Sequence, residues 1–490
     1  MSSKDGYHWT PGTGLTGGLP CEGVVTPPKQ VSAGAHYDVI VAGAGFAGLI
    51  ASRDLALRGY KVLLIDARDR IGGRTWTSIN DGFPFELGGA WFHWNQPHVF
   101  SQLSRYNLAD ELNVSFDVTG GIEKTSLNYE EGAQETVTTE LSDMEQELMY
   151  EKLGAIYFNI DGALGRNVMP YPHMPWFNPA VREFDKLSAF DRVEEIREDL
   201  TELETNALKS YLLLLSGGTP KTAGFLSLLH WWMLRSSQSG SWGTQGEESY
   251  KLKHGTTSLA RRLLADGLQS GNIDLVLSEP VAKVSDAGDR VTVTVTNGKT
   301  FTATKVISTI PLNVLKTVEF SPPLSTLKIE AIHTGHTGFH SKVHFEAAGT
   351  SLRSWSGHSY PGHGLLFAYG DEITPKGNTH IAAFGASTDV LHGENNIENI
   401  QKALLHLRSD IDIQRVLFHD WCQDPYSRGS WSMYPKGFLT KYLSALQERH
   451  GNVWFASSDW ADGWTGFIDG AIEQGTRAAQ SVADALLARR

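Results

Sequence analysis

Two short apolar runs flank a helical pattern near the start of the chain. Residues 37–42 and 61–65 are mostly apolar, which is typical of strands buried on both faces. Residues 47–58 between them predict a helix that ends at Gly59, because glycine is favoured just beyond helix ends. The order strand, helix, strand over this short distance predicts a βαβ unit.

Helical and strand patterns alternate along the rest of the chain. Residues 139–217 have a mostly helical texture, and the helix stop falls at Gly217-Gly218. Residues 291–295 alternate between apolar and polar positions, and Asn297-Gly298 predicts a hairpin turn after them. We expect further strands within 273–309 and at 340–347 and 378–386, and helices at 397–408 and 471–487. Because no repeat or low-complexity linker separates these segments, we expect a mixed α/β protein with discontinuous domains.

Composition and charge exclude several classes of protein. The 490 residues are 41% hydrophobic, which provides enough apolar material for a core around a buried ligand. Lys and Arg total 42 against 55 Asp and Glu, so the net charge of −13 argues against nucleic acid and anionic membrane surfaces as partners. The two cysteines, Cys21 and Cys422, are too few for a disulfide scaffold or a cysteine-rich zinc site.

Targeting signals and membrane-spanning segments would indicate where in the cell the protein is located. No run of about 18 apolar residues predicts a membrane span. The first residues lack the apolar region of a signal peptide, and the last residues are not the Ser-Lys-Leu peroxisomal signal. We therefore expect a soluble protein of the cytoplasm or of an organelle, with the peroxisome left open, and not a secreted one.

The loop between the first predicted strand and helix has the pattern of a dinucleotide-binding loop. Its residues Gly43, Ala44, Gly45, Phe46, Ala47 and Gly48 fit G-x-G-x-x-G. The first glycine allows a tight turn, the second lets the backbone approach a pyrophosphate, and the third lets helix and strand pack closely. The helix N-terminus then offers unpaired N–H groups and a partial positive charge to the phosphates.

An acidic residue follows the second strand at the spacing that such a loop requires. Asp66 lies 18 residues beyond Gly48. Its carboxylate can accept hydrogen bonds from both hydroxyls of a ribose, and it would repel a 2′-phosphate, which disfavours NADP. We therefore expect this βαβ unit to bind the adenosine half of a dinucleotide.

The loop alone leaves FAD and NAD open, but the residues after it favour FAD. Further glycine pairs occur at 72–73 and 88–89, and three arginines lie within residues 68–74. A ligand that the backbone approaches at so many separate places is long and buried, as FAD is. We expect Arg74 to offset the diphosphate charge through a bidentate contact.

The string DARDRIGGR at residues 66–74, after the GAGFAG loop, resembles the flavin-containing amine oxidase family. That family includes monoamine oxidases, polyamine oxidases and L-amino-acid oxidases. The resemblance covers nearly the whole chain beyond residue 36 and is closest to fungal monoamine oxidases, as residues 88–94 and 458–460 indicate. The family usually carries Glu at the ribose position, and Asp66 is one methylene shorter.

The resemblance implies a fold and its domain boundaries. The expected fold is a Rossmann-like FAD-binding domain with a discontinuous substrate domain of mixed sheet and helices. The FAD-binding domain is expected from residues 36–115, 250–325 and 425–490, and the substrate domain from residues 116–249 and 326–424. Residues 1–35, rich in glycine and proline, predict an extended arm.

The resemblance also implies how the flavin is held. Besides the glycine loop, the expected contacts are Asp66, Ala67, Arg68, Gly73, Arg74, Leu87, Gly88, Gly89, Ala90, Trp91, Val281, Trp421, Ser458, Asp459 and Ile468. Ser430 stands where several relatives carry the cysteine that binds flavin covalently. Because serine cannot form that thioether, we expect FAD to be bound non-covalently.

Three residues match the catalytic machinery of the family. Trp431 and Phe467 match the two aromatic residues that flank the amine path, where most animal relatives have tyrosine. Their rings can guide an amine by shape and cation–π attraction. Lys342 matches the lysine that holds a water near flavin N5, where a positive charge favours electron transfer to oxygen. The substrate cavity is expected to include Leu213, Trp231, Met233, Trp431 and Phe467.

Four histidines, His333, His336, His340 and His344, cluster within a segment that we expect to be a strand. Because such histidines would not converge on one point, we expect no metal site. The apolar cavity fits an amine with a hydrophobic body, and it lacks an evident arginine to anchor a carboxylate. This composition disfavours amino-acid oxidation.

These expectations combine into an FAD-dependent monoamine oxidase. It would convert a hydrophobic amine and O2 to an imine and H2O2, and the imine would hydrolyse to aldehyde and ammonia. The alternatives are a flavin oxidase for a polyamine, an L-amino acid or a biosynthetic alkaloid amine, and a flavin-bound interaction protein. Expected partners are a small-molecule amine and O2, with no nucleic acid and no membrane, and a homodimer stays open.

Overall fold

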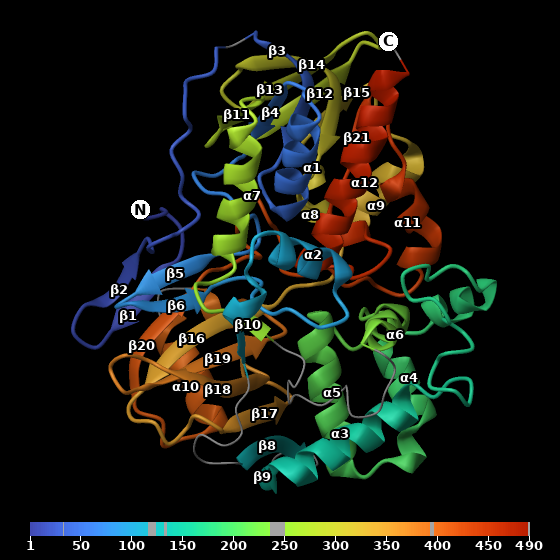
Figure 1. Cartoon of the computed structure of the whole chain (residues 1–490). Helices are drawn as coiled ribbons and strands as arrows, with labels where there is room; N and C mark the ends of the chain where they lie inside the picture. The colour runs from blue at the N-terminus through green and yellow to red at the C-terminus, as the bar shows by residue number, and fades with distance from the viewer. Residues whose placement is uncertain (33, 116–123, 132–134, 236–249, 393–395, 489–490) are drawn as a thin grey trace.

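The computed structural model describes all residues except 33, 116–123, 132–134, 236–249, 393–395 and 489–490. Two large sheets organise the molecule, one near the top and one near the lower left in Figure 1. Between the sheets run the loops that carry the predicted site. The mixed α/β class expected from the sequence is confirmed.

The upper sheet has eight strands. Its order is β11 (Ile273–Val276), β4 (Val62–Ile65), β3 (His36–Ala42), β14 (Thr300–Ser308), β13 (Val291–Val295), β12 (Val281–Asp286) and β15 (Glu319–Ser321), and β21 (Val453–Phe455) also pairs with β14. The strands β11, β4, β3, β14 and β21 are mutually parallel along their pairings. The predicted βαβ unit is therefore present, and β13 and β14 form the hairpin expected at Asn297-Gly298.

Helices cover both faces of this sheet. Helices α1 (Phe46–Leu57), α7 (Thr257–Gln269) and α12 (Ile468–Leu487) lie side by side over one face (Figure 1). The other face packs on α8 (Leu312–Leu315), α9 (Thr326–Thr334) and α11 (Phe438–Gln447). Because both faces are covered, the parallel strands are continuous apolar runs, which is the pattern read from residues 37–42 and 61–65.

The lower sheet has nine strands. Its order is β2 (Gly14–Gly17), β1 (Tyr7–Thr10), β20 (Ile413–Phe418), β16 (Ser341–Ala347), β19 (Thr379–Gly385), β18 (Phe367–Ile373), β17 (Ser356–Tyr360), β8 (Lys124–Glu131) and β9 (Glu135–Ser142). The first two strands belong to the N-terminal segment for which we expected an extended arm. They form a hairpin that extends this sheet by pairing with β20.

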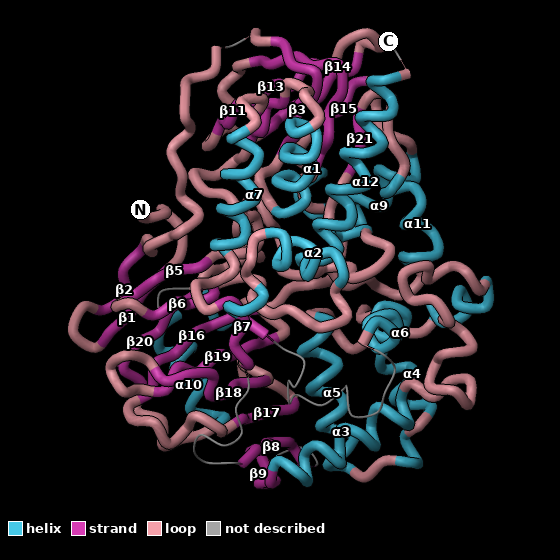
Figure 2. Tube along the Cα trace, viewed as in Figure 1, coloured by secondary structure: helices cyan, strands magenta, loops and turns pink. Residues whose placement is uncertain are grey.

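Helices gather beside the lower sheet, at the lower right of Figure 2. They are α3 (Asp143–Tyr157), α4 (Ala189–Glu195), α5 (Glu202–Ser216) and α6 (Phe225–Leu234), whereas α10 (Asn396–Leu407) packs on the sheet itself. The helical texture expected from residue 139 starts later, because residues 139–142 belong to β9. Ser142 then caps α3 through a reciprocal pair of hydrogen bonds with Glu145.

One short hairpin, one two-stranded antiparallel sheet formed by segments far apart in the sequence, and one short helix lie outside the two large sheets. They are β5 (Thr77–Asn80) with β6 (Phe83–Glu86), β7 (Leu112–Val114) with β10 (Tyr250–Leu252), and α2 (Pro97–Arg105). The assignment of these segments to an FAD-binding and a substrate domain stays a proposal. Among the described residues, no helix is both long and apolar enough to cross a membrane.

The histidine-rich segment is not a single strand. His333 lies in α9, His336 and His340 lie in the loop after it, and only His344 lies in β16. The expectation of a strand over the whole segment was therefore wrong, because the helix continues to Thr334 and ends at Gly335, which has a φ of +68°. In the described parts of the chain, no group of three metal-ligating side chains converges.

Candidate functional site

The carboxyl ends of the parallel strands meet at one edge of the upper sheet. Gly43 follows β3, Asp66 follows β4, Thr309 follows β14, and Ser457 comes two residues after β21. All four residues line one cavity. Ligands of open α/β sheets bind at this edge, so the sheet topology alone places the site here.

The glycine loop has the close contacts that its spacing predicts. Gly43 has a φ of +113°, and a Cβ atom on Gly48 would lie 1.8 Å from the carbonyl oxygen of Gly43. Gly45 lines the cavity with its backbone. The turn therefore requires glycine at position 43, and the close approach of helix and strand requires it at position 48. Gly45, between them, leaves its backbone open to a ligand.

Helix α1 begins at this loop without a side-chain cap. Its N-cap residue is Gly45, which offers no side-chain oxygen to the first N–H groups of the helix. The first turn also contains no acidic side chain. These N–H groups face a site where a phosphate would satisfy them and would be favoured by the helix dipole.

Asp66 is held by the backbone at the end of β4. One carboxylate oxygen accepts the N–H of Ala44 at 2.6 Å, and the other accepts the N–H of Arg68 at 2.8 Å. Burial raises the pKa of Asp66, and these two N–H groups act in the opposite direction. The carboxylate is thereby fixed beside the glycine loop, and its remaining lone pairs suit the two hydroxyls of a ribose.

Arg74 is engaged differently from our expectation. Its guanidinium donates to the Asp459 carboxylate at 2.6 Å, the Ser458 hydroxyl at 3.0 Å and the Ser430 carbonyl at 2.8 Å. Although burial acts to raise it, Arg74 keeps the pKa of Asp459 below its usual range. Arg74 borders the cavity, and through these three separate acceptors it ties three loops together.

One cavity of about 890 Å³ joins the glycine loop to the aromatic residues expected at the substrate. It brings together most of the predicted site. The predicted residues that line it are Gly43, Gly45, Phe46, Ala47, Asp66, Ala67, Arg68, Gly73, Arg74, Leu87, Gly88, Gly89, Ala90, Trp91, Trp231, Val281, Lys342, Trp421, Trp431, Ser458, Phe467 and Ile468. A continuous space of this size accommodates a long cofactor and a small substrate.

The two predicted aromatic residues are fixed by contacts with neighbouring side chains and backbone. Trp431 donates its indole N–H to the Leu215 carbonyl at 2.8 Å and stacks on His340 with ring centroids 3.6 Å apart. Phe467 makes edge contacts with Trp231 at 4.8 Å and with Trp464 at 5.0 Å. Because neither ring can turn freely, both present fixed apolar surfaces to the cavity.

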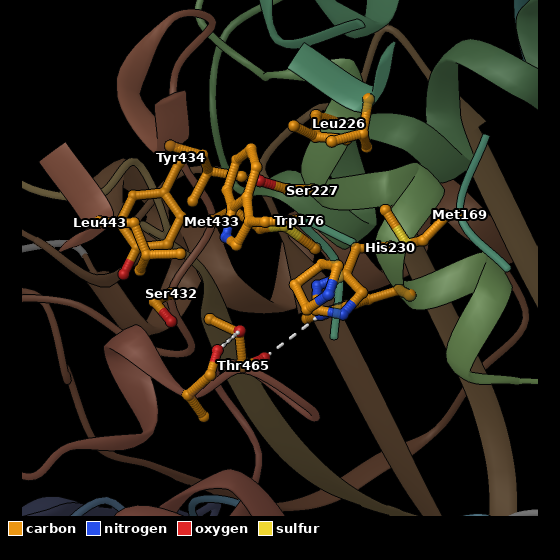
Figure 3. A pocket seen from close by; sticks show the side chains of 15 residues that line it. Met169, Trp176, Leu226, Ser227, His230, Ser432, Met433, Tyr434, Leu443 and Thr465 are labelled. Carbon is orange, nitrogen blue, oxygen red and sulfur yellow. Dashed lines mark hydrogen bonds between the residues drawn. The ribbon is translucent and has the colours of Figure 1, made fainter. Parts of the chain in front are cut away.

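A small cavity of about 20 Å³ lies outside the main one, against Trp231 (Figure 3). It is lined by Trp176, His230, Tyr434 and the Ser227 and Ser432 hydroxyls, among others. The indole N–H of Trp231 donates to the Thr465 carbonyl at 3.2 Å beside this space. Its volume suits about one water molecule, so it supports the aromatic wall and is not a substrate site.

Lys342 reaches the cavity from β16. Its ammonium donates to the Glu86 carbonyl at 2.6 Å and the Gly88 carbonyl at 2.8 Å, and it lies 4.4 Å above the Trp91 ring. An ammonium has three donors, so one remains for the cavity that Lys342 lines. Burial lowers the pKa of Lys342 to about 7, while the Glu86 carboxylate acts to raise it.

Comparison with known proteins assigns this arrangement to a family. A family model described as flavin containing amine oxidoreductase matches residues 46–483. The chain belongs to the flavin-containing amine oxidoreductases. It is 32% identical to pseudooxynicotine dehydrogenase from a Pseudomonas species over 92% of this chain and 87% of that one. It is 30% identical to nicotine dehydrogenase from Pseudomonas putida, covering 93% and 90% of the two chains.

More distant relatives of this oxidoreductase include monoamine oxidases. Amine oxidase B of Sus scrofa is 24% identical, with 92% of this chain and 86% of that one covered. Among solved structures, putrescine oxidase bound to putrescine superposes with a TM-score of 0.72 at 20% identity, covering 92% and 99% of the chains. Cyclohexylamine oxidase from Brevibacterium oxydans superposes equally well, with a TM-score of 0.72 at 19% identity and the same coverage. These structures share the fold of this oxidoreductase.

The residues of the oxidoreductase fit the flavin that its family requires. The uncapped N-terminus of α1 and the backbone of Gly45 suit a diphosphate, and the fixed Asp66 carboxylate suits a ribose. The N-terminus of α12, at Ile468, borders the same cavity with no side-chain cap. A helix N-terminus there would stabilise negative charge on the ring system that accepts electrons.

Five predicted residues do not line the cavity of the oxidoreductase. Ala44, Gly48 and Asp459 are buried next to it and act through the Asp66, Gly43 and Arg74 contacts described above. Leu213 and Met233 pack into the core of the helical region instead. On α5 the cavity is lined by Tyr211, Leu214 and Leu215, so the rotation of this helix differs from our expectation.

Several cavity residues of the oxidoreductase were not predicted. Arg235, at the end of α6, lines the cavity, which corrects the expectation that no arginine is available there. Tyr369 and Phe384 line it from β18 and β19. His340 was set aside as a metal ligand, yet it stacks on Trp431. The spacing of Lys342 and His344 by two residues could have placed both on one face of β16, whereas His340 lies in the loop just before this strand.

Proposed function

We propose that this protein is an FAD-dependent amine oxidase that acts on a hydrophobic monoamine. It would convert an amine and O2 to an imine and H2O2, with two electrons and two protons leaving the C–N unit. Water would then convert the imine to an aldehyde and ammonia. The nitrogen must be uncharged when the C–H bond breaks, because its lone pair assists the loss of hydride.

One observation supports this proposal most strongly. A single cavity has a dinucleotide-binding loop at one end, Trp431 and Phe467 at the other, and the Lys342 ammonium on its wall. Bound FAD would supply the hydride acceptor and the route for electrons to oxygen. The fixed aromatic rings would orient the amine and exclude water, and the Lys342 charge would favour the anionic product of electron transfer to oxygen.

We propose that the cofactor is bound non-covalently, and the surroundings of Ser430 support this. Its hydroxyl donates to the Gly338 carbonyl at 2.9 Å and lies 2.6 Å from His340 Nδ1. The nearest cysteine in sequence, Cys422, does not line the cavity, and burial raises the pKa of its thiol to about 12. A protonated thiol is a poor nucleophile. We expect acid precipitation to release all yellow colour into the supernatant, and colour retained in the pellet would contradict this.

The substrate class can be tested with a panel of amines. We expect oxygen uptake with hexylamine and benzylamine and much weaker uptake with spermine and leucine, because the cavity is lined mainly by apolar and aromatic side chains. H2O2 release should match oxygen uptake one to one. Activity with leucine alone would refute the monoamine proposal and would point to Arg235 as a carboxylate anchor.

Oxidation of an alkaloid amine is the second candidate. It is favoured by the identity of 32% and 30% to proteins named pseudooxynicotine dehydrogenase and nicotine dehydrogenase. Because both of these proteins are named dehydrogenases, an electron acceptor other than oxygen must also be tested. The panel should therefore include both compounds, and each amine should be assayed with oxygen and, without oxygen, with an electron-accepting dye. Faster turnover with the dye than with oxygen would favour a dehydrogenase.

A further inference from the structure

A chain of buried ionisable side chains leads from Lys342 into the protein, away from the cavity lining. The Glu86 carbonyl accepts from Lys342 at 2.6 Å and is contacted by His344 Nε2 at 2.9 Å. His344 Nδ1 lies 2.8 Å from His380 Nε2, and His380 Nδ1 lies 3.2 Å from an Asp371 carboxylate oxygen. All these side chains are at most 6% exposed, so water does not screen them.

A second route joins Asp371 to Lys342. The Ser115 hydroxyl donates to Asp371 at 3.0 Å and accepts the Trp91 indole N–H at 2.7 Å. The Trp91 ring in turn lies beneath the Lys342 ammonium. Asp371 is therefore the point at which both routes from the lysine meet.

Asp371 is ionised, and its charge is only partly neutralised locally. It forms an ion pair with Lys251, which also pairs with Glu372 at 2.7 Å. Although burial acts to raise it, Lys251 keeps the pKa of Asp371 well below its usual range. Lys251 thus shares its charge between two carboxylates, and the cluster carries excess negative charge near Lys342.

Proton counting fixes the orientation of the two imidazoles. A carbonyl only accepts, so His344 Nε2 carries a proton and Nδ1 is an acceptor when the ring is neutral. His380 Nε2 must then donate to it. Burial lowers the pKa of both rings, so we expect both to be neutral at pH 7. In this form His380 Nδ1 has no proton to donate to Asp371, so the hydrogen-bonded link from Asp371 towards Lys342 is the route through Ser115 and Trp91, and the two rings only pack between Asp371 and the Glu86 carbonyl.

We propose that Asp371 is a positioning residue for Lys342, and that the Asp371–Lys251 pair sets the pH at which the cavity-facing ammonium loses its charge. This inference rests on the role proposed above for Lys342 in the reaction with oxygen. Asp371 does not line the cavity, so it acts on Lys342 only through other groups.

The charges around Lys342 determine the sign of each expected effect. The Glu86 carboxylate from β6 and Asp371 from β18 favour the ammonium, Lys251 from β10 opposes it, and His344 and His380 are neutral. Since the pKa of Lys342 is about 7, the charge is present below that pH and is lost above it. Removing Asp371 must therefore move this loss to lower pH, and removing Lys251 must move it to higher pH.

Three variants test this sign pattern through the rate at which oxygen re-oxidises the reduced enzyme, measured from pH 5.5 to about 9. We expect the falling limb of the profile to shift down by about 0.5 to 1 pH unit in Asp371→Asn and up by a similar amount in Lys251→Met. The double variant should return close to the wild-type profile. If one single variant fails to fold, the other and the double variant still decide the sign.

Controls separate this inference from the function on which it rests. Asp185→Asn removes an equally buried carboxylate that accepts the N–H of Thr440 at 2.7 Å, and it should leave the limb in place. If the re-oxidation rate of Lys342→Met still falls with rising pH as in the wild type, both the proposed role of Lys342 towards oxygen and this inference are contradicted. A limb that is lost in Lys342→Met but unmoved in Asp371→Asn and Lys251→Met would contradict only this one, and would leave Asp371 a purely structural role.

A second measurement does not depend on turnover. In flavin-free protein, the pH at which Lys342 becomes reactive towards formaldehyde and cyanoborohydride can be followed by peptide mass spectrometry. It should shift in the same directions in Asp371→Asn and Lys251→Met. Equal reactivity profiles in wild type and both variants would overturn the inference.

Discussion

Replacement of Lys342 by methionine slows re-oxidation of the reduced enzyme by oxygen about 10²- to 10³-fold, the range found when one preorganised electrostatic group is removed. The reason is the position of the Lys342 ammonium: it is buried, held by two backbone carbonyls and open to the cavity. Methionine keeps the length and packing of the side chain but removes the charge. Stopped-flow mixing of the photoreduced enzyme with oxygenated buffer measures this step alone.

The reductive half-reaction gives the internal comparison for Lys342→Met. Anaerobic bleaching by the best amine should change less than about threefold, because in the described part of the chain the Lys342 ammonium lies over the rings of Trp91 and Phe384 and not over those of Trp431 or Phe467. Lys328→Met is a matched control, since Lys328 is also buried and its pKa is also lowered to about 7, but it lies between α9 and α11, outside the cavity. Equal slowing in both variants would show a general effect of charge loss and would refute the assigned role.

The part of the site that could be predicted from sequence depends on short-range spacing. Gly43, Gly48 and Asp66 are positioned by one βαβ unit, whose strand and helix patterns are legible within a few residues. Lys342, Trp431 and Phe467 were identified by resemblance and not by any local pattern. The structure places all three on one cavity, although 125 residues separate the first from the last, as their numbering shows.

The errors concern features that only tertiary packing determines. Periodicity predicts α5 but not its rotation, so Leu213 was expected where Leu214 and Leu215 lie. The Arg74–Asp459 pair joins residues 385 positions apart, and no spacing rule connects them. A local motif therefore suggested a phosphate ligand where the fold supplies a carboxylate.

The contact between His344 and His380 is another feature that the sequence could not predict. His344 and His380 meet because β16 and β19 pair antiparallel, with His344 opposite Ala382 and Glu346 opposite His380. These two histidines are thus diagonal neighbours on one face. The register of the pair decides this contact, and a shift by one residue would place the two rings on opposite faces.

Replacement of Gly48 by alanine abolishes flavin binding. The new Cβ would lie 1.8 Å from the Gly43 carbonyl oxygen and 3.2 Å from the Thr309 hydroxyl, so α1 must move away from β3. That movement displaces the uncapped N-terminus of α1 from the place where it can hold a phosphate. We expect purified Gly48→Ala to be colourless, with affinity for added FAD weakened at least about 100-fold, a loss of roughly 2.7 kcal/mol.

Gly17→Ala, whose Cβ meets no atom within 4 Å, controls for the substitution itself and should stay yellow. Full flavin occupancy in Gly48→Ala would show that the loop can relax without losing the cofactor, and would contradict the geometry on which the assignment of this cavity depends.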